Sequence, residues 1–389
     1  MPAGEGFRPL LTVRVRAFAL CAAGAAALGF AAAASSPVAS GASAPGAPDT
    51  PAWEWRLPPG FPEPRVPPDN PMSAAKVALG RRLFHERRLS LNETQACADC
   101  HRQALAFTDG RARAVGSTGA AHRRSAPSLA NVAYAASLTW ADPNVRRLEE
   151  QARIPLLGTD PVEMGFGGRE AELEARLRVD AGYAAHFASA FPGEAEPVTF
   201  DNLARALAAF ERTLVSGNSA YDRLVYQGKM DALSDAAWRG LRLFFSERTG
   251  CASCHGGLLF SGGFDYDRLE RPAAPRFVDN GLLEAAERKG PQAVDPGLAR
   301  ATGRRRDRGL FKTPTLRNIA VTAPYMHDGR IATLEGVLDH YARPGSTHPV
   351  GGGMILEAGE REDLLTFLRS LTDESFLADP ALAAPAGDR

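Results

Sequence analysis

Cys97-Ala98-Asp99-Cys100-His101 is the stretch that decides the fold of this 389-residue chain, and Cys251-Ala252-Ser253-Cys254-His255 repeats it in the other half. Two thiols three residues apart lie on one side of a helical turn, where each can bond to one vinyl group of a haem. The next residue then brings an imidazole to the iron. The two copies therefore predict two covalently bound c-type haems, with His101 and His255 as iron ligands.

A structural zinc site, a redox dithiol and coincidence are the alternatives to haem attachment at these motifs. Zinc gathers its Cys-x-x-Cys pairs within about 20 residues, and these two pairs lie much farther apart. A thioredoxin-like dithiol needs a βαβ surround and has no use for a histidine after the second cysteine. Both copies carry the histidine, and together they hold four of the five cysteines. The two-haem interpretation is favoured.

Composition excludes one large class of partners. Lys plus Arg and Asp plus Glu each total 45, so the chain has no net field of the kind that marks a nucleic-acid binder. The length suits two ordinary domains after a leader is removed.

The N-terminus indicates the compartment. Arg8, Arg14 and Arg16 precede an apolar run over 17–34, and a stretch of small residues follows it. This pattern predicts a signal peptide over 1–34 and export to the periplasm, and c-type haem is attached outside the cytoplasm. The run is long for a signal, so an uncleaved anchor is the alternative, and only then would the protein contact a membrane. Cys21 lies inside the run.

The remaining chain reads as all-α and loop-rich. Residues 35–70 are rich in Pro, Ala, Gly and Ser, which predicts a linker with Trp53 and Trp55 as its large side chains. Ser73 is a good N-cap for the first helix. Apolar periodicity predicts helices over 74–84, 129–136, 148–152, 171–179, 181–191, 200–214, 234–245, 333–342 and 360–371.

The two halves resemble each other beyond the haem motifs. The segment 78–84, before the first motif, matches 240–244, before the second. The repetition indicates duplication of one small haem-binding unit. We therefore expect two cytochrome c-like haem domains in tandem, over 71–214 and 215–375, and a flexible tail over 376–389.

Several segments, in this order, carry a resemblance to a known family over residues 70–372. The chain resembles the bacterial di-haem cytochrome c peroxidases, and within them the MauG-like branch, which includes the MbnH enzymes. Beyond the two haem motifs, the matching segments are Leu79-Gly80-Arg81-Arg82-Leu83-Phe84, Ala126-Pro127-Ser128-Leu129-Ala130-Asn131, Leu148-Glu149-Glu150-Gln151, Pro161-Val162-Glu163-Met164, Lys312-Thr313-Pro314-Thr315-Leu316 and Pro324-Tyr325-Met326-His327-Asp328-Gly329.

The resemblance implies that the two haems differ in role. The first haem would react with hydrogen peroxide, and the second would exchange electrons with it. Peroxidases that detoxify peroxide carry a Met ligand 14 residues after the histidine that matches His327, whereas MauG-like members carry Tyr; here the position is Tyr341. Met326 and His340 are nearby rivals, and Tyr341 could instead simply end its helix. A tyrosine oxygen stabilises highly oxidised iron better than a thioether does.

On the peroxide side the resemblance implies an open iron position. Ser117 stands where detoxifying members place a distal histidine, and His122 is either a substitute for it or an exposed loop residue. Glu163 matches the distal acid-base residue, with Gln151 and Pro155 as its companions in the pocket. A solvated loop carboxylate is the alternative for Glu163.

Two further sets of residues match positions between the haems. Trp140 matches a tryptophan that shortens the electron route between them, although a buried Trp is also common core filling. Asn131, Thr322 and Pro324 match a calcium site built from a side-chain oxygen and carbonyls, a weak signal without acidic ligands.

Three functions remain open from the sequence alone. The first is an oxidoreductase that uses hydrogen peroxide and a high-valent two-haem state to oxidise a residue, Trp above all, of a periplasmic partner protein. The second is a cytochrome c peroxidase that detoxifies peroxide with electrons from a small cytochrome or cupredoxin. The third is a non-enzymatic di-haem electron carrier. Tyr341 argues against the second, and Ser117 with Glu163 argues against the third.

Overall fold

The computed structural model describes residues 53–271, 273–283, 295–343 and 353–386, so the predicted leader lies outside the described part. Within these ranges no helix is long and apolar enough to cross a membrane. The helices of the first half are α1 (Ala74–Phe84), α2 (Cys97–Cys100), α3 (Leu148–Gln151), α4 (Arg153–Leu157), α5 (Glu170–Arg178), α6 (Ala181–Ala190) and α7 (Phe200–Glu211). Those of the second half are α8 (Ala220–Gln227), α9 (Asp235–Phe244), α10 (Cys251–Cys254), α12 (Ala299–Thr302), α13 (Leu334–Ala342), α14 (Ala358–Arg369) and α15 (Glu374–Leu377).

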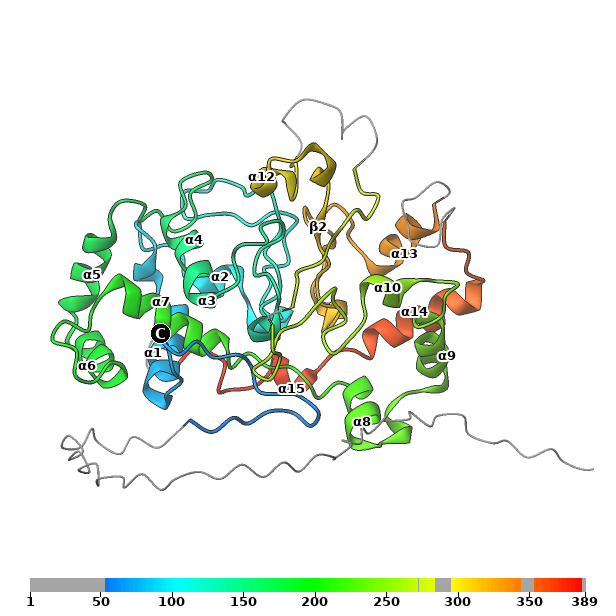
Figure 1. Cartoon of the computed structure of the whole chain (residues 1–389), viewed down its shortest axis with the longest axis horizontal. Coiled ribbons are helices and arrows are strands. Elements are labelled where there is room, and N and C mark those ends of the chain that lie inside the picture. Colours follow the sequence, from blue (N-terminus) through cyan, green and yellow to red (C-terminus); the bar gives the residue numbers. More distant parts are fainter. Residues whose placement is uncertain (1–52, 272, 284–294, 344–352, 387–389) are drawn as a thin grey trace, which may run out of the picture. The chain divides into compact units, whose positions relative to one another are not determined.

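The fold is helical, as predicted. The β-structure of the described residues is a single antiparallel pair, β1 (Phe277–Val278) with β2 (Phe311–Lys312), together with isolated bridges. Short 3₁₀ turns and loops connect the helices in Figure 1. Most predicted helices are present with small shifts at their ends, and Ser73 caps α1 by accepting a hydrogen bond from the Lys76 amide.

The first half is built on the crossing of α1 and α7. Gly80 stands at the crossing, where a Cβ atom would lie 1.9 Å from the Ala206 carbonyl oxygen. Only glycine allows two helix backbones to approach so closely. Phe84 and Phe210 pack beside the crossing, with ring centroids 5.3 Å apart.

The second half repeats this crossing with α9 and α14, which lie on the other side of the molecule in Figure 1. A Cβ atom on Gly240 would lie 2.0 Å from the Asp363 carbonyl oxygen. Phe244 and Phe367 take the places of the first pair, with ring centroids 5.2 Å apart. The duplication expected from 78–84 and 240–244 is thus present in the packing.

The repeat also includes a segment whose apolar pattern predicts a helix that does not form. Residues 129–136 contain only the 3₁₀ turn Val132–Tyr134, because Asn131 adopts a left-handed conformation (φ 61°) that ends any α-helix. Asn318 in the second half does the same (φ 60°). The two amides donate to equivalent carbonyls, Asn131 to Leu214 (2.7 Å) and Asn318 to Leu371 (3.0 Å).

Both chain segments outside the two haem units pack more firmly than expected. Arg65, in the predicted linker, forms a two-pronged ion pair with Asp265 of the second half. In the predicted flexible tail, Phe376 and Leu382 are buried in the core of the first half. The tail prediction was wrong for 376–386, because Phe376 packs against Phe107 (ring centroids 5.5 Å apart) and Arg81 donates to the Pro380 carbonyl oxygen (2.7 Å).

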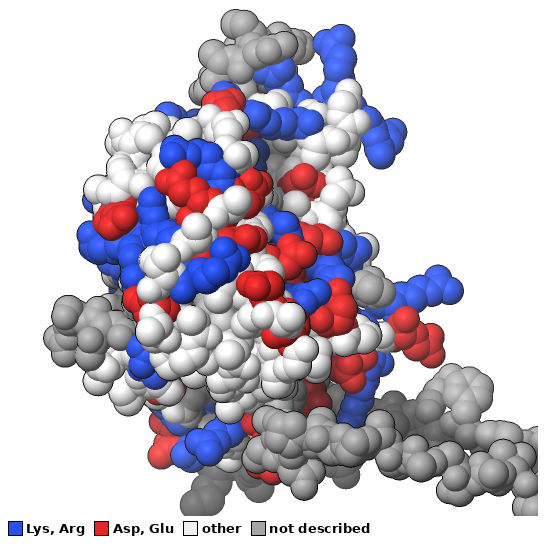
Figure 2. Space-filling model, turned by 90° about the vertical axis from the view of Figure 1, so that its left-hand side faces the viewer, with Lys and Arg blue, Asp and Glu red and all other residues white. Residues whose placement is uncertain are grey.

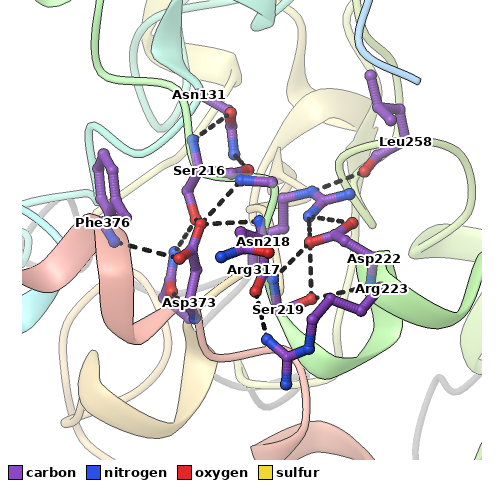
Figure 3. A network of polar contacts seen from close by, with 12 residues as sticks. Asn131, Ser216, Asn218, Ser219, Asp222, Arg223, Leu258, Arg317, Asp373 and Phe376 are labelled. Atoms are coloured by element: carbon purple, nitrogen blue, oxygen red, sulfur yellow. Dashed lines mark hydrogen bonds and ion pairs between the residues drawn. The ribbon is translucent and has the colours of Figure 1, made fainter. Parts of the chain in front are cut away.

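A buried polar network joins the two halves (Figure 3). The Asp373 carboxylate accepts hydrogen bonds from the amides of Gly217 and Asn218 (both 2.9 Å), which lie in the connection between the halves. Beside it, the Arg317 guanidinium is fully buried and pairs with Asp222 (2.8 and 2.9 Å). Because Asp373 and Arg317 both form hydrogen bonds with other segments, the network fixes the connection between the halves.

The surface carries mixed charges. The face in Figure 2 intersperses Lys and Arg with Asp and Glu, and neither sign forms a continuous field. This distribution agrees with the equal totals of acidic and basic residues.

Candidate functional site

Two cavities contain the two Cys-x-x-Cys-His motifs. The first, of about 260 Å³, lies between α2, α3, α4, α7 and the loop that carries Glu163. It brings together nearly all the residues predicted for the peroxide side: Cys97, Cys100, His101, Trp140, Gln151, Pro155 and Glu163. The second, of about 160 Å³, is lined by Cys251, Cys254, His255 and Tyr341.

The two motif histidines are held alike. The Nδ1 atom of His101 donates to the Phe107 carbonyl oxygen (2.8 Å), and that of His255 donates to the Phe260 carbonyl oxygen (2.9 Å). Burial lowers the pKa of both imidazoles, which keeps them neutral. Fixing the proton on Nδ1 leaves Nε2 with its lone pair, as an iron ligand requires.

The residues present therefore fit two c-type haems. Each cavity has two reduced cysteines on one helical turn, and these thiols form no disulfide in the described structure. The walls are largely apolar, as a haem face requires, with Phe84, Leu129 and Leu207 in the first cavity and Leu338, Leu364 and Leu368 in the second.

Glu163 is positioned by the backbone on both sides of it. Its carbonyl oxygen accepts from the Ser117 amide (2.8 Å), while the Met164 amide donates to the Pro155 carbonyl oxygen (3.0 Å). The Met164 carbonyl oxygen in turn accepts from the Leu91 amide (2.8 Å). Pro155 thus helps to hold the loop that presents the carboxyl group, a role that its residue type alone did not suggest.

The Glu163 carboxyl group faces His122 across the first cavity, with Oε1 3.4 Å from Nε2 of the imidazole. Burial raises the pKa of Glu163 to about 7 and lowers the pKa of His122. At neutral pH the carboxyl group can therefore either accept or give up a proton, as an acid-base catalyst must. The Glu163 side chain lines the cavity and is 35% exposed, so its catalytic role stays a prediction.

His122 does not match the alternative of an exposed loop residue. Its side chain is only 19% exposed and lines the first cavity, because its amide is hydrogen-bonded to the Ala114 carbonyl oxygen (2.7 Å) and turns the ring inward. Ser117 is not among the lining residues, and its carbonyl oxygen accepts from Asn92 (2.8 Å). No histidine stands at the position of Ser117, and the histidine in the cavity is His122.

In the second cavity Tyr341 has Met326 as its rival. Tyr341 ends α13 beside the two cysteines of α10, and burial raises the pKa of its hydroxyl group. Met326 lines the same cavity, but its sulfur accepts a hydrogen bond from the Asn280 amide group (3.4 Å). His340 is absent from the lining, because its Nε2 atom is hydrogen-bonded to the Asn280 carbonyl oxygen (2.7 Å).

A third cavity of about 120 Å³ lies between the first two and shares walls with each. Trp140 lines it and the first cavity, and its indole nitrogen donates to the Ser125 carbonyl oxygen (2.9 Å). Next to it, the ammonium group of Lys312 donates to the Ser137 carbonyl oxygen (3.0 Å), and burial lowers its pKa to about 8.

The predicted calcium ligands Asn131, Thr322 and Pro324 line this third cavity together. The Asn131 side chain already exchanges two hydrogen bonds with the backbone of Ser216 (both 3.0 Å). The Thr322 hydroxyl group donates to the Ile319 carbonyl oxygen (3.2 Å). The described residues hold no cluster of three or more acidic, His or Cys side chains suited to a metal ion, so calcium stays a prediction.

The sequence analysis missed two ionisable residues of the first cavity, Arg124 and Glu211. Glu211 is the buried carboxyl group. It lies on α7 among core residues, only 6% exposed, and lines the cavity four residues after Leu207. Burial raises its pKa to about 8. Aligning α7 with α14 by their phenylalanines, Phe210 and Phe367, would have exposed it, because the equivalent position is Leu368.

Comparisons with known proteins agree with this geometry. A profile of the family described as di-haem cytochrome c peroxidase matches residues 74–231. The methylamine utilization protein MauG of Methylorubrum extorquens strain AM1 is 35% identical, over 82% of this chain and 84% of its own length. The cytochrome-c peroxidase IdrP1 of Pseudomonas sp. strain SCT is 36% identical, over 79% of this chain and 83% of its own length.

Among solved structures, a MauG-like protein associated with microbial copper homeostasis superposes with a TM-score of 0.80. Its sequence is 44% identical, and the match covers 86% of this chain and 99% of that one. The similarity therefore extends over both cavities.

Proposed function

The chain belongs to the di-haem cytochrome c peroxidase family, and on this premise we propose that it uses hydrogen peroxide to oxidise a residue of a partner protein. Membership implies two c-type haems and a peroxidase-type oxidoreductase. The finer proposal is that the first cavity is the peroxide site, that the second haem stores an oxidising equivalent, and that the oxidised residue is Trp. The proposed compartment is the periplasm, from the leader over 1–34.

The observation that carries the proposal is the asymmetry of two cavities built on one repeated scaffold. The first presents Glu163, His122 and Gln151 to its interior. The second presents mainly aliphatic and aromatic side chains, with the phenols of Tyr341 and Tyr325 and the carboxyl group of Asp279. Acid-base groups are needed where peroxide is cleaved, and a mainly apolar pocket suits a haem that only exchanges electrons.

In the first cavity a bound haem would supply the iron that takes up peroxide. Glu163 would accept a proton from the peroxide and return it to the departing oxygen, which would leave as water. His122, whose Nε2 atom lies 3.4 Å from the carboxyl group, would orient it. Because the pKa of Glu163 is about 7, the same group can carry out both steps near neutral pH.

In the second cavity we propose that the Tyr341 oxygen would hold the haem iron together with His255. A phenolate is a hard donor, so it favours oxidised iron, whereas the thioether of Met would favour the reduced form. The third cavity lies between the two sites, and Trp140 lines both it and the first cavity. Electrons from the second haem to the first would pass through Trp140.

A second candidate function is peroxide removal with electrons from a small cytochrome or cupredoxin. Two observations favour it: the 36% identity to IdrP1, which is named a cytochrome-c peroxidase, and the presence of the Met326 sulfur in the second cavity.

One experiment separates the two functions. Diferric protein is mixed with hydrogen peroxide and with proteins encoded beside it, and each partner is then analysed by mass spectrometry. The proposal expects oxygen added to, or hydrogen removed from, a Trp of one partner, with negligible turnover of a reduced small cytochrome. Rapid cytochrome oxidation without any change in partner mass would establish the second function instead.

A further inference from the structure

Glu211 is the feature of the first cavity that the proposed acid-base chemistry does not use. Its carboxyl oxygen Oε2 is buried and has no hydrogen-bond partner among the described residues. Glu211 lies on α7 and lines the first cavity together with Cys97. Cys97 is one of the two cysteines that would bind the haem. An unpartnered buried carboxyl oxygen is costly, so a role is expected for it.

The internal repeat gives the matched comparison. Leu207 and Glu211 of α7 line the first cavity as Leu364 and Leu368 of α14 line the second. The packing of these helices is equivalent, from the glycine crossing to the phenylalanine pair. A leucine therefore suits this position in the scaffold, and a carboxyl group is not required by the fold.

The charges around Glu211 leave it without a cation of its own. Arg212 donates to Glu149 of α3 (2.7 Å), and both are buried. Arg147 also lies 3.8 Å from Glu149, so two guanidinium groups share that carboxylate, and the hydrogen bond of Arg212 goes to Glu149 and not to Glu211. Among the other elements, α1 contributes Lys76, which is bonded to Asn70 (3.2 Å), and α2 contributes Cys97. Glu163 and His122 line the same cavity.

We propose that Glu211 binds a proton when the first haem is reduced and releases it when that haem is oxidised. The inference rests on the proposed function only in requiring a haem in the first cavity. A buried site has little solvent to screen the added charge, so the electron and the proton favour each other's binding. Leu368 cannot do this, so the second haem lacks the same coupling.

The step balances with one electron and one proton. On reduction the iron gains an electron from an external one-electron donor, and the Glu211 carboxylate gains a proton from solvent through the cavity. On oxidation the electron leaves to an acceptor and the proton returns to solvent. Burial already raises the pKa of Glu211 to about 8, so the coupling falls within the physiological range.

The test is a spectroelectrochemical titration of the holoprotein from pH 6 to pH 10. In the native protein, at fixed potential, the ratio of reduced to oxidised first haem should fall as the pH rises, by up to tenfold per pH unit around pH 8. Glu211→Gln and Glu211→Leu should abolish this dependence, and at high pH both should favour the reduced form relative to the native protein. Glu211→Leu introduces the residue found at the equivalent position of the second cavity, Leu368. It therefore keeps the test possible if the Glu211→Gln variant does not fold.

Two further variants sharpen the test. Glu163→Gln removes the other carboxyl group of the cavity whose pKa is raised. This variant should keep the pH dependence of the first haem's reduction near pH 8. Leu368→Glu should give the second haem a pH dependence that it lacks. The inference is overturned if both Glu211 variants titrate as the native protein does, or if Glu163→Gln alone removes the effect. Neither result would contradict the proposed oxidation of a partner protein, because that proposal is tested separately by mass spectrometry of the partner.

Discussion

The two cavities that hold the Cys-x-x-Cys-His motifs share one helix packing but are lined by different side chains. The glycine crossing, the phenylalanine pair and the imidazole-to-carbonyl hydrogen bond recur in both halves. The side chains that face the two interiors differ, with Glu163, His122 and Glu211 in the first cavity and Tyr341, Tyr325 and Asp279 among apolar residues in the second. A duplicated haem scaffold can therefore be specialised by a few polar substitutions without changing its packing.

The largest effect is expected from removing one pair of cysteines. Cys97→Ala with Cys100→Ala should halve the covalent haem content and abolish the reaction with peroxide, because Glu163 and His122 line the first cavity. The matched pair Cys251→Ala with Cys254→Ala should lose the same amount of haem and still bind peroxide. Haem staining and stopped-flow spectra measure both. Peroxide reactivity that survives only in the first variant would reverse the roles of the cavities.

Next in size is the loss of the acid-base group. Glu163→Gln should slow the reaction with peroxide by about 10²–10⁴-fold, the usual contribution of such a group. Because the carboxylate is the reactive form and its pKa is about 7, the native rate should fall about tenfold per pH unit below pH 7. The variant should lack this acid limb. Stopped-flow rates against pH measure both, with exposed Glu150→Gln as the control; a native rate that rises on acidification would contradict the assignment.

A spectral change should separate the two candidate ligands of the second haem. Tyr341→Phe should convert that haem from low spin to high spin in the ferric electron paramagnetic resonance spectrum, since it removes the axial oxygen. Met326→Leu, in the same cavity, should leave the spectrum unchanged. The reverse pattern would make the sulfur of Met326 the ligand and would favour the peroxide-removing function.

The smallest effect tests whether the two scaffolds are equivalent. Gly80→Ala and Gly240→Ala should each lower the free energy of unfolding by ~1–3 kcal/mol, because the added methyl group would meet a carbonyl oxygen at about 2 Å. Gly359→Ala, in the first turn of α14 with open space around it, should instead stabilise by about 0.5 kcal/mol. Denaturant unfolding measures all three. A neutral Gly240→Ala would mean that the second crossing is looser than the first.

The sequence predicted the parts of this fold whose causes are local. The cap at Ser73 and the apolar periodicity after it are sufficient to define α1, and the spacing within each Cys-x-x-Cys-His motif is sufficient to place a haem. The resemblance to a family located Glu163, Gln151 and Pro155, which the structure brings into one cavity.

What the sequence could not predict depends on distant contacts. The apolar run 129–136 reads as a helix, but the Asn131 amide is bonded to Leu214, and the left-handed turn there prevents one. His122 reads as a loop residue until the loop is folded over Glu163. The burial of Glu211 could not be predicted, because one carboxyl group in a largely apolar helix does not form a repeating pattern in the sequence.

The packing of residues 374–386 against the first half has a consequence for biosynthesis. Phe376 and Leu382 are part of the first core, yet the ribosome makes them after the whole second half. Domains normally fold in the order of their synthesis, N-terminal first. Here the first unit lacks part of its core until the second is complete, so both Cys-x-x-Cys-His motifs should remain open together to the machinery that attaches haem.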